Sequence, residues 1–251
     1  MCGILSYYSK SFLTEKEISE SLASLSSIKH RGPDSEGVVL INTETGDYKI
    51  LKTKDTPKDI DFKLTYSSKY NLLMGHRRLK IIDLTNSAHQ PMSYLNFWIS
   101  YNGEIYNYLE IKNELKKKGY VFDSQSDTEV VLKAYHYWGD QCVDKFNGMW
   151  SFIIWDNNLK SIFISNDRFG VKPLYNFINN QLCIFTSEIK QFDHFSKVKK
   201  TKNRVNYNLF LDYGYPPLDG TTYFNEINRF PCGSYSRFNF DNYKEKKVEK
   251  F

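Results

Sequence analysis

Short apolar segments that recur in pairs across turn-forming residues constrain the fold of this chain more than any other feature. The turn Asp156-Asn157-Asn158, for example, separates two apolar runs, and runs of this length around such residues predict β-hairpins. Three such pairs occur: residues 37–41 with 48–51, 149–155 with 162–165, and 174–177 with 182–186. The sequence therefore predicts antiparallel sheets.

Further strands and a few helices fill the intervals between these hairpins. Shorter apolar runs predict strands at residues 2–8, 72–74, 81–84 and 97–101. Thr14 and Glu17 match a capping box at the start of a helix that reaches Lys29, and Ser126 and Glu129 match a second one. The second helix ends at Gly139, and another helix begins at Asn107 and ends before Gly119.

The order of these elements indicates an α+β architecture. Strands dominate, hairpins occur at both ends, and the regular strand–helix alternation of a parallel α/β fold is missing. We therefore expect antiparallel sheets with helices on their outer faces. After Lys197 the apolar pattern weakens, and prolines and glycines interrupt it, at Pro216-Pro217, Gly220 and Pro231. This last stretch is predicted to be an extended, lightly structured trailer.

Composition narrows the class of protein and its partners. Hydrophobic residues make up 41% and charged residues 25% of the 251 residues, which is ordinary globular usage. The mean hydropathy is −0.54, and no apolar run reaches the ~20 residues of a membrane helix. The net charge of +5 comes from dispersed lysines rather than a dense basic stripe, so nucleic acid is not an expected partner. We expect neither membrane nor nucleic-acid binding.

The four cysteines indicate free thiols rather than a metal site or disulfides. They are widely spaced, at Cys2, Cys142, Cys183 and Cys232, with no Cys-x-x-Cys pair. The first residues lack the basic and apolar regions of a secretion signal. A reducing, cytoplasmic location is therefore expected, with no metal ion.

Cys2 becomes chemically special if the initiator methionine is removed. The residue then carries both a thiol and a free α-amine, whose pKa of about 7.7–8.0 lets it accept a proton near neutral pH. A nucleophile with its base in the same residue needs no separate histidine. The alternative is that Cys2 is a small buried residue that opens a strand.

Other polar segments offer chemistry that complements such a nucleophile. Arg78 can bind a carboxylate through two parallel hydrogen bonds, or form a surface ion pair. Asn102 and Gly103 offer a side-chain amide and an unhindered backbone N–H, or simply make a tight turn before a helix. Asp127 can bind a substrate ammonium, or serve the helix end. The charged turn His30-Arg31-Gly32-Pro33-Asp34 can contribute to function, or it can simply be a loop-forming segment after a helix.

Taken together, these segments resemble the class II glutamine amidotransferase domain, an N-terminal nucleophile hydrolase. Within that family the chain is most similar to the N-terminal domain of glutamine-hydrolysing asparagine synthetase, from Cys2 to about Lys190 and more loosely beyond. The matching motifs occur in the same order as in that family: Met1 to Ile4, His30 to Asp34, Asn102 to Asn107, Ser126 to Glu129, Phe146 to Trp150, and Asp167 to Tyr175.

The resemblance implies a role for each residue. Cys2 would attack the side-chain amide of glutamine, and its α-amine would carry the protons. Asn102 and Gly103 would form the oxyanion hole. The glutamine α-carboxylate would be bound by Arg78, and its α-ammonium by Asp127 and Glu104. The resemblance also implies a four-layer αββα sandwich of two mainly antiparallel sheets.

The chain departs from the family after this domain. Members continue into a synthetase domain that adenylates aspartate and carries a Ser-Gly-Gly-x-Asp-Ser loop, which this sequence lacks. Residues 2–195 would be the glutaminase domain, and residues 196–251 a linker toward an absent synthetase domain, as in a fragment. Cofactors are expected only for that missing domain, namely ATP and magnesium. Glutamine and the synthetase domain are the expected partners, and a homodimer is compatible with the sequence.

Two other functions stay open at this point. The chain can be the glutaminase half of another class II amidotransferase, although residues 104–107 argue against this. It can also be a degenerate module that only binds partners. Such modules are marked by loss of site residues, whereas Cys2, Arg78, Asn102 and Asp127 are all present.

Overall fold

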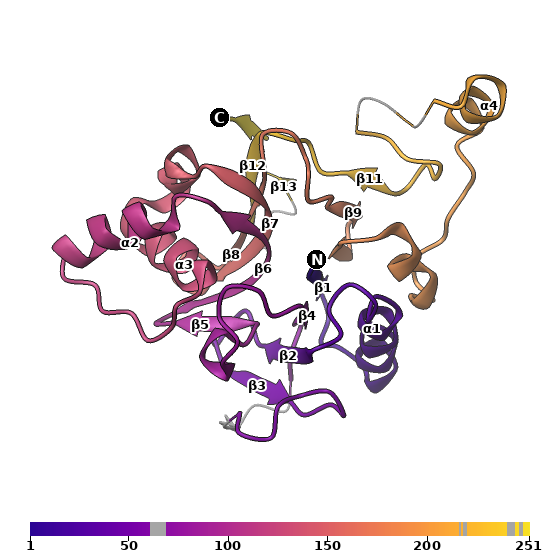
Figure 1. Ribbon diagram of the computed structural model, residues 1–251. Coiled ribbons are helices and arrows are strands. Elements are labelled where there is room, and N and C mark those ends of the chain that lie inside the picture. Colours follow the sequence, from indigo (N-terminus) through magenta and orange to yellow (C-terminus); the bar gives the residue numbers. More distant parts are fainter. Residues whose placement is uncertain (61–68, 216, 218–219, 240–243, 246–247) are drawn as a thin grey trace.

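Two antiparallel sheets stack face to face in the computed structural model, which describes residues 1–251 except 61–68, 216, 218–219, 240–243 and 246–247 (Figure 1). The first sheet has the strand order β11-β9-β10-β1-β4-β2-β3. Its strands are β1 (Gly3–Ser9), β2 (Ser35–Ile41), β3 (Tyr48–Leu51), β4 (Leu72–Arg78), β9 (Tyr175–Ile178), β10 (Leu182–Thr186) and β11 (Asn228–Arg229). The three hairpins predicted from the sequence are confirmed, since β2 pairs with β3, β7 with β8, and β9 with β10.

The second sheet has the order β13-β12-β8-β7-β6-β5, with β14 also paired to β12. Its strands are β5 (Met92–Tyr94), β6 (Phe97–Ile105), β7 (Gly148–Asp156), β8 (Ser161–Asn166), β12 (Ser234–Asn239), β13 (Lys244–Glu245) and β14 (Glu249–Lys250). Helices α1 (Glu15–Ser27), α2 (Tyr108–Lys117), α3 (Asp127–Trp138) and α4 (Arg204–Tyr213) accompany the sheets. Three 3-10 helices complete the described elements: η1 (Asn86–Ala88), η2 (Gly139–Lys145) and η3 (Ile189–His194).

The buried side chains define four layers. One cluster lies between the sheets and includes Ile4 and Met74 from the first sheet and Trp98 from the second. A second cluster joins the outer face of the first sheet to Leu25 of α1 and Phe192 of η3. The third lies under α2 and α3. The expected αββα sandwich is therefore confirmed.

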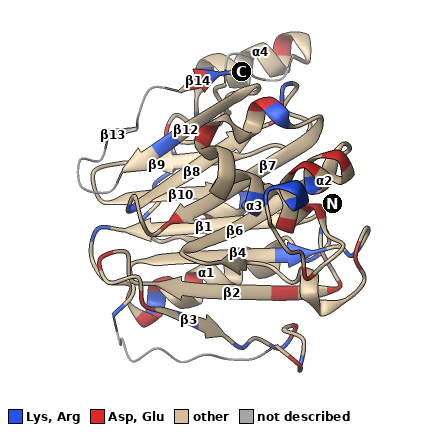
Figure 2. Ribbon diagram, turned by 90° about the vertical axis from the view of Figure 1, so that its left-hand side faces the viewer, with Lys and Arg blue, Asp and Glu red and all other residues tan. Residues whose placement is uncertain are grey.

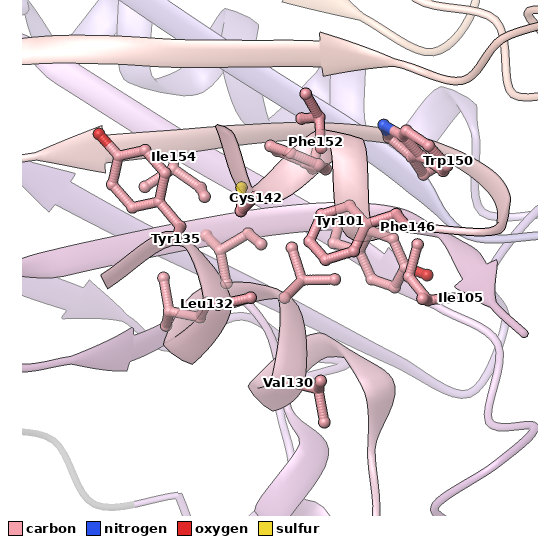
Figure 3. Packing of buried hydrophobic residues seen from close by; sticks show 14 of the residues in the cluster. Tyr101, Ile105, Val130, Leu132, Tyr135, Cys142, Phe146, Trp150, Phe152 and Ile154 are labelled. Atoms are coloured by element: carbon pink, nitrogen blue, oxygen red, sulfur yellow. The ribbon is translucent and has the colours of Figure 1, made fainter. Parts of the chain in front are cut away.

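Figure 3 shows the third cluster, in which α3 packs on the outer face of the second sheet. Tyr135 of α3 lies beside Ile154 of β7, and Leu132 and Phe152 belong to the same cluster. Each fully buried side chain of this size stabilises the fold by about 1.5–3 kcal/mol relative to exposure. This packing fixes the position of α3, whose first residue is Asp127.

The first predicted capping box is confirmed and the second is wrong in its acidic half. Thr14 Oγ1 accepts from the Glu17 N–H at 3.2 Å, and Glu17 accepts from the Thr14 N–H at 2.9 Å. Ser126 does cap α3 by accepting from the Thr128 N–H at 3.2 Å. Glu129, however, accepts from the N–H groups of residues 123 and 124 instead. Its carboxylate also pairs with Lys133 at 2.6 Å, and Lys133 donates to the Val121 carbonyl next to these N–H groups.

The predicted strand at residues 81–84 is also wrong. These residues form a loop in which Ile81 and Leu84 are 55% and 68% exposed. The guanidinium of Arg78 donates to the carbonyls of Asp83 and Thr85, so the loop folds back toward the end of β4. The apolar run at residues 81–84 is therefore part of a loop, whereas β4 extends to Arg78 and β6 to Ile105.

The expected lightly structured trailer is corrected by the structure. Within residues 196–251, β12 pairs with β8 over six residue pairs and β11 pairs with β9, so this segment completes both sheets. The edges of β8 and β9 offer backbone hydrogen-bonding groups that need partners, and short strands between prolines and glycines supply them. Helix α4 differs: none of its residues is buried, and Val205, Leu211 and Tyr213 are exposed on it, away from the sheets (Figure 1).

None of the helices in the described part of the chain combines the length and apolar character that crossing a membrane requires.

Candidate active site

Four segments that are distant in sequence meet at one small cavity. The pairing of Gly3 with Arg77 places Cys2, just before β1, beside Arg78 at the end of β4. The cavity is lined by five of the six residues predicted from the sequence, Cys2, Arg78, Gly103, Glu104 and Asp127. Figure 2 shows the strands as mostly uncharged, with the basic end of β4 as an exception.

Asn102, the sixth predicted residue, adjoins the cavity without lining it. The residue is 1% exposed, and the alternation of β6 directs its side chain to the same face as Trp98, between the sheets. Its Nδ2 donates to no described residue. A buried amide donor without a partner is costly, so this group is available to a ligand.

The Cys2 thiol is held by one backbone segment. The Leu79 N–H donates to Sγ at 3.4 Å, and Sγ lies 3.7 Å from the Leu79 carbonyl. Burial raises the pKa of the thiol, and the Leu79 N–H, the chain's amino group and Arg78 offset this only in part. The thiol is therefore protonated near neutral pH and needs a base to act as a nucleophile.

Arg78 is a buried cation whose described partners are neutral. Its Nη1 donates to the Thr85 carbonyl at 2.6 Å, and its Nη2 donates to the Asp83 carbonyl. Burial lowers the pKa of Arg78, although the charge of Asp83 opposes this. Among the described residues it forms no ion pair, so its charge and its remaining N–H groups can bind a carboxylate.

Asp127 is a buried anion in the same situation. Its Oδ2 accepts from the Tyr101 hydroxyl at 2.6 Å and from the Ile105 N–H at 3.0 Å. Burial raises the pKa of Asp127, and these hydrogen bonds offset the rise only in part. No Lys or Arg in the described ranges pairs with it.

A buried cation and a buried anion thus line one cavity without pairing with each other. Isolated buried charges cost several kcal/mol, and a ligand with the opposite charges recovers part of that cost. The carboxylate and ammonium of a free α-amino acid have this complementary pattern of charges.

The edge of β6 provides a further donor. Strand β5 pairs with β6 only as far as Ile99, and beyond that point side chains take the place of a strand. The Tyr101 N–H donates to Gln90 Oε1 at 2.7 Å, and the Ile105 N–H donates to Asp127. Because alternate residues of a strand point the same way, the Gly103 N–H lies on this edge between them and faces the cavity.

Position 103 also requires glycine for steric reasons. A Cβ built on Gly103 would lie 2.4 Å from the Met149 carbonyl oxygen and 2.8 Å from the Trp150 Cα, both of them backbone atoms of β7. No rotation of a side chain relieves such a clash. The close approach of β7 therefore explains why a bare backbone N–H is presented here.

Several residues of the site had no clear sequence signal. Gln90, Tyr101, Thr128 and the loop residues Leu79 and Ile81 also line the cavity. The sequence offered only a positional hint for some of them, since Leu79, Tyr101 and Thr128 are each adjacent to a predicted site residue. The motif around Arg31, noted as a charged turn, contacts Cys2.

Arg31 binds the backbone of that residue rather than its thiol. Its Nε donates to the Cys2 carbonyl at 2.8 Å, and its Nη1 pairs with Glu188 at 3.1 Å. No group of three or more His, Cys, Asp or Glu residues that can hold a metal occurs in the described residues.

Arg78→Lys is expected to raise the KM for a substrate with a free carboxylate at least about tenfold and to change kcat less, because a single ammonium cannot replace a two-bond guanidinium. Steady-state kinetics over a range of substrate concentrations would measure both constants. Arg204→Lys, an exposed change on α4, is the matched control. A loss confined to kcat would show that Arg78 acts in the chemical step.

Two buried histidines make stability depend on pH. Burial lowers the pKa of His76 to about 3 and that of His89 to about 4. Below pH 6.5 the unfolded chain binds protons that the native protein does not, so the free energy of unfolding falls with pH. At pH 5 each histidine should have removed about 2 kcal/mol relative to pH 7.

Urea unfolding at pH 7 and pH 5 tests this dependence. His89→Gln should reduce the loss between the two values by about half, because it removes one of the two buried histidines. An equal loss in wild type and His89→Gln would contradict the assignment.

Comparisons with known proteins agree with this geometry. The model of the glutamine amidotransferase domain matches residues 57–249. Asparagine synthetase (glutamine-hydrolysing) 1 of Bacillus subtilis is 36% identical over 194 residues, which cover 76% of this chain and 26% of that protein. Asparagine synthetase (glutamine-hydrolysing) 3 of the same organism is 29% identical over 233 residues, 90% of this chain and 33% of that protein.

The chain therefore spans about a quarter to a third of these relatives. Among solved structures, glutamine phosphoribosylpyrophosphate amidotransferase of Bacillus subtilis superimposes with a TM-score of 0.68, at 18% identity, over 99% of this chain and 49% of that one. This likeness shows a shared fold, which agrees with the expected sandwich of two antiparallel sheets. By the family match over residues 57–249, the chain belongs to the glutamine amidotransferase domain family.

Proposed function

We propose that this domain hydrolyses glutamine to glutamate and ammonia, with Cys2 as the nucleophile. The observation that carries the proposal is the single cavity in which the Cys2 thiol lies with an unpaired cation, Arg78, and an unpaired anion, Asp127. These charges would orient the α-carboxylate and α-ammonium of glutamine, with Glu104 assisting Asp127. Orientation at one end of the substrate places the amide at the thiol.

In the first step Sγ attacks the side-chain amide carbon of glutamine, and the thiol proton passes to a base. The amide oxygen becomes negative, and the Asn102 Nδ2 and Gly103 N–H groups would donate to it. The C–N bond then breaks, the base returns the proton to nitrogen, and ammonia leaves. Water cleaves the glutamyl thioester in the same way and regenerates Cys2.

We assign the base to the α-amine of Cys2, which requires removal of Met1. The raised pKa of the thiol makes a base necessary. None of the described residues that line the cavity is a histidine, and Asp127 is assigned to the substrate ammonium. An α-amine titrates near neutral pH and lies on the same residue as the thiol.

The remaining part of the function lies outside this domain. Because the chain spans only part of its relatives, we propose that a second, ATP-dependent and magnesium-dependent domain transfers the ammonia to aspartate. Hydrolysis itself needs only a thiol, a base and donors, so we propose no cofactor for this half. The exposed apolar residues of α4 favour a further contact surface.

The four cysteines of the chain are free thiols, which favours a reducing compartment, the cytoplasm.

The test is to measure glutamate, ammonia and asparagine release from glutamine by the purified chain, with and without ATP, magnesium and aspartate. We expect glutamate and ammonia in equal amounts, at a rate that the three additions do not change, and no asparagine. Asparagine formation by this chain alone would contradict the division of labour, and the absence of glutamate release would contradict the glutaminase assignment.

A further inference from the structure

Tyr101 precedes the two proposed oxyanion donors on β6. On the edge of β6 that faces away from β7, side chains instead of a neighbouring strand hold its backbone. Pairing with β5 stops at Ile99, which leaves the next outward-facing residue, Tyr101, without a strand partner on that side. Two side chains bind its two backbone groups. The Tyr101 ring is itself buried in the cluster under α3 (Figure 3).

His76 binds the carbonyl of Tyr101. This histidine lies on β4 in the first sheet, is fully buried, and its Nε2 is 2.9 Å from the Tyr101 oxygen in the second sheet. A carbonyl only accepts, so Nε2 carries the proton and donates. This oxygen belongs to the peptide that joins Tyr101 to Asn102, so the bond restrains the start of the Asn102–Gly103 segment.

Gln90 binds the N–H of the same residue. Its Oε1 accepts from the Tyr101 N–H at 2.7 Å, while its Nε2 donates to Thr128 Oγ1 on α3 at 3.1 Å. Gln90 is buried and borders the active-site cavity. Both ends of its amide are therefore used, which ties β6 to the helix that carries Asp127.

We propose that His76 and Gln90 form a backbone clamp, positioning residues that hold the Asn102–Gly103 segment in the geometry needed for oxyanion stabilisation. The inference rests on the glutaminase function proposed above. Oxyanion donors work because they are fixed before the reaction, at 2.7–3.1 Å from the place where charge develops. This segment is paired with β7 on one side only, and on its other edge the two side chains take the place of a strand and restrain it.

The clamp makes a prediction that separates chemistry from binding. His76→Leu and Gln90→Met each replace a polar side chain by an apolar one of comparable length. Each therefore removes that residue's hydrogen bond to the Tyr101 backbone. Each should lower kcat for glutamine hydrolysis about tenfold or more, since one oxyanion donor is worth about 10²–10³, and change KM less than about twofold. Both hold the backbone of one residue, Tyr101, so the double variant should lose less than the product of the single effects.

A second readout distinguishes positioning from general distortion. Alkylation of Cys2 by iodoacetamide creates no oxyanion, so its rate should stay within about twofold of wild type in the clamp variants. His76→Gln retains an N–H donor and should recover most of the kcat that His76→Leu loses. Tyr7→Phe, which removes a buried 2.9 Å hydrogen bond to Glu17 on the far face of the first sheet, is the control and should keep wild-type kcat.

Wild-type kcat in Gln90→Met would overturn the clamp even where His76→Leu fails to fold. A rise in KM alone, or alkylation that slows as much as kcat, would overturn it as well, because each indicates a role in binding or in general structure. Cys2→Ala is measured alongside. Full activity of Cys2→Ala would reject the proposed function itself, a result distinct from failure of the clamp.

Discussion

Cys2→Ala is expected to abolish glutamine hydrolysis while the protein stays folded. The thiol is the proposed site of covalent attack, so its loss removes the thioester route entirely, whereas the residue lies before β1 and adds little to the core. Release of glutamate would be measured with the thermal unfolding midpoint of each variant. The midpoint should shift by less than a few degrees, because the packing lost is small.

Cys2→Ser is the matched variant, since it keeps the shape of the side chain and the α-amine but weakens the nucleophile. Mass spectrometry of the active protein tests the base at the same time. Turnover in Cys2→Ala above the rate without enzyme would place the nucleophile elsewhere. Full activity of protein that retains Met1 would show that the α-amine is not the base.

Asn102→Ala is expected to lower kcat by about 10²–10³ and to leave KM for glutamine nearly unchanged, the usual effect of losing one oxyanion donor. The reason is that Nδ2 has no partner among the residues that the structure describes and would gain one only when the amide oxygen becomes charged. Steady-state kinetics over a range of glutamine concentrations separates the two constants.

Ser151→Ala is a suitable control for this change. Ser151 is paired with Asn102 across β6 and β7, is equally buried, and also has an unpartnered polar atom among the described residues. It has no proposed part in the reaction, so its kcat should equal that of wild type. A rise in KM with normal kcat in Asn102→Ala would show that Asn102 binds the ground state.

Local patterns were enough for most of the hairpins and helices, because a strand pair or a capped helix depends on residues close in sequence. The predicted turn follows Asp156, the last residue of β7, and connects it to β8, and Thr14 caps α1. The same reasoning failed for residues 81–84, where Arg78 holds the loop through contacts that no local pattern encodes. It also failed for residues 234–239, which form β12 only because β8 offers an edge.

What the sequence by itself determined about this protein is its α+β class, its antiparallel hairpins and, through motifs, the types of residue in its site. Only the tertiary structure decided that Cys2, Arg78 and Asp127 share one cavity with their charges unpaired. It also decided that Gln90 and His76 hold the strand beside Asn102. The physical reason is distance along the chain. Burial, which shifts the pKa of a side chain and leaves a donor without a partner, arises only where segments far apart in sequence pack together.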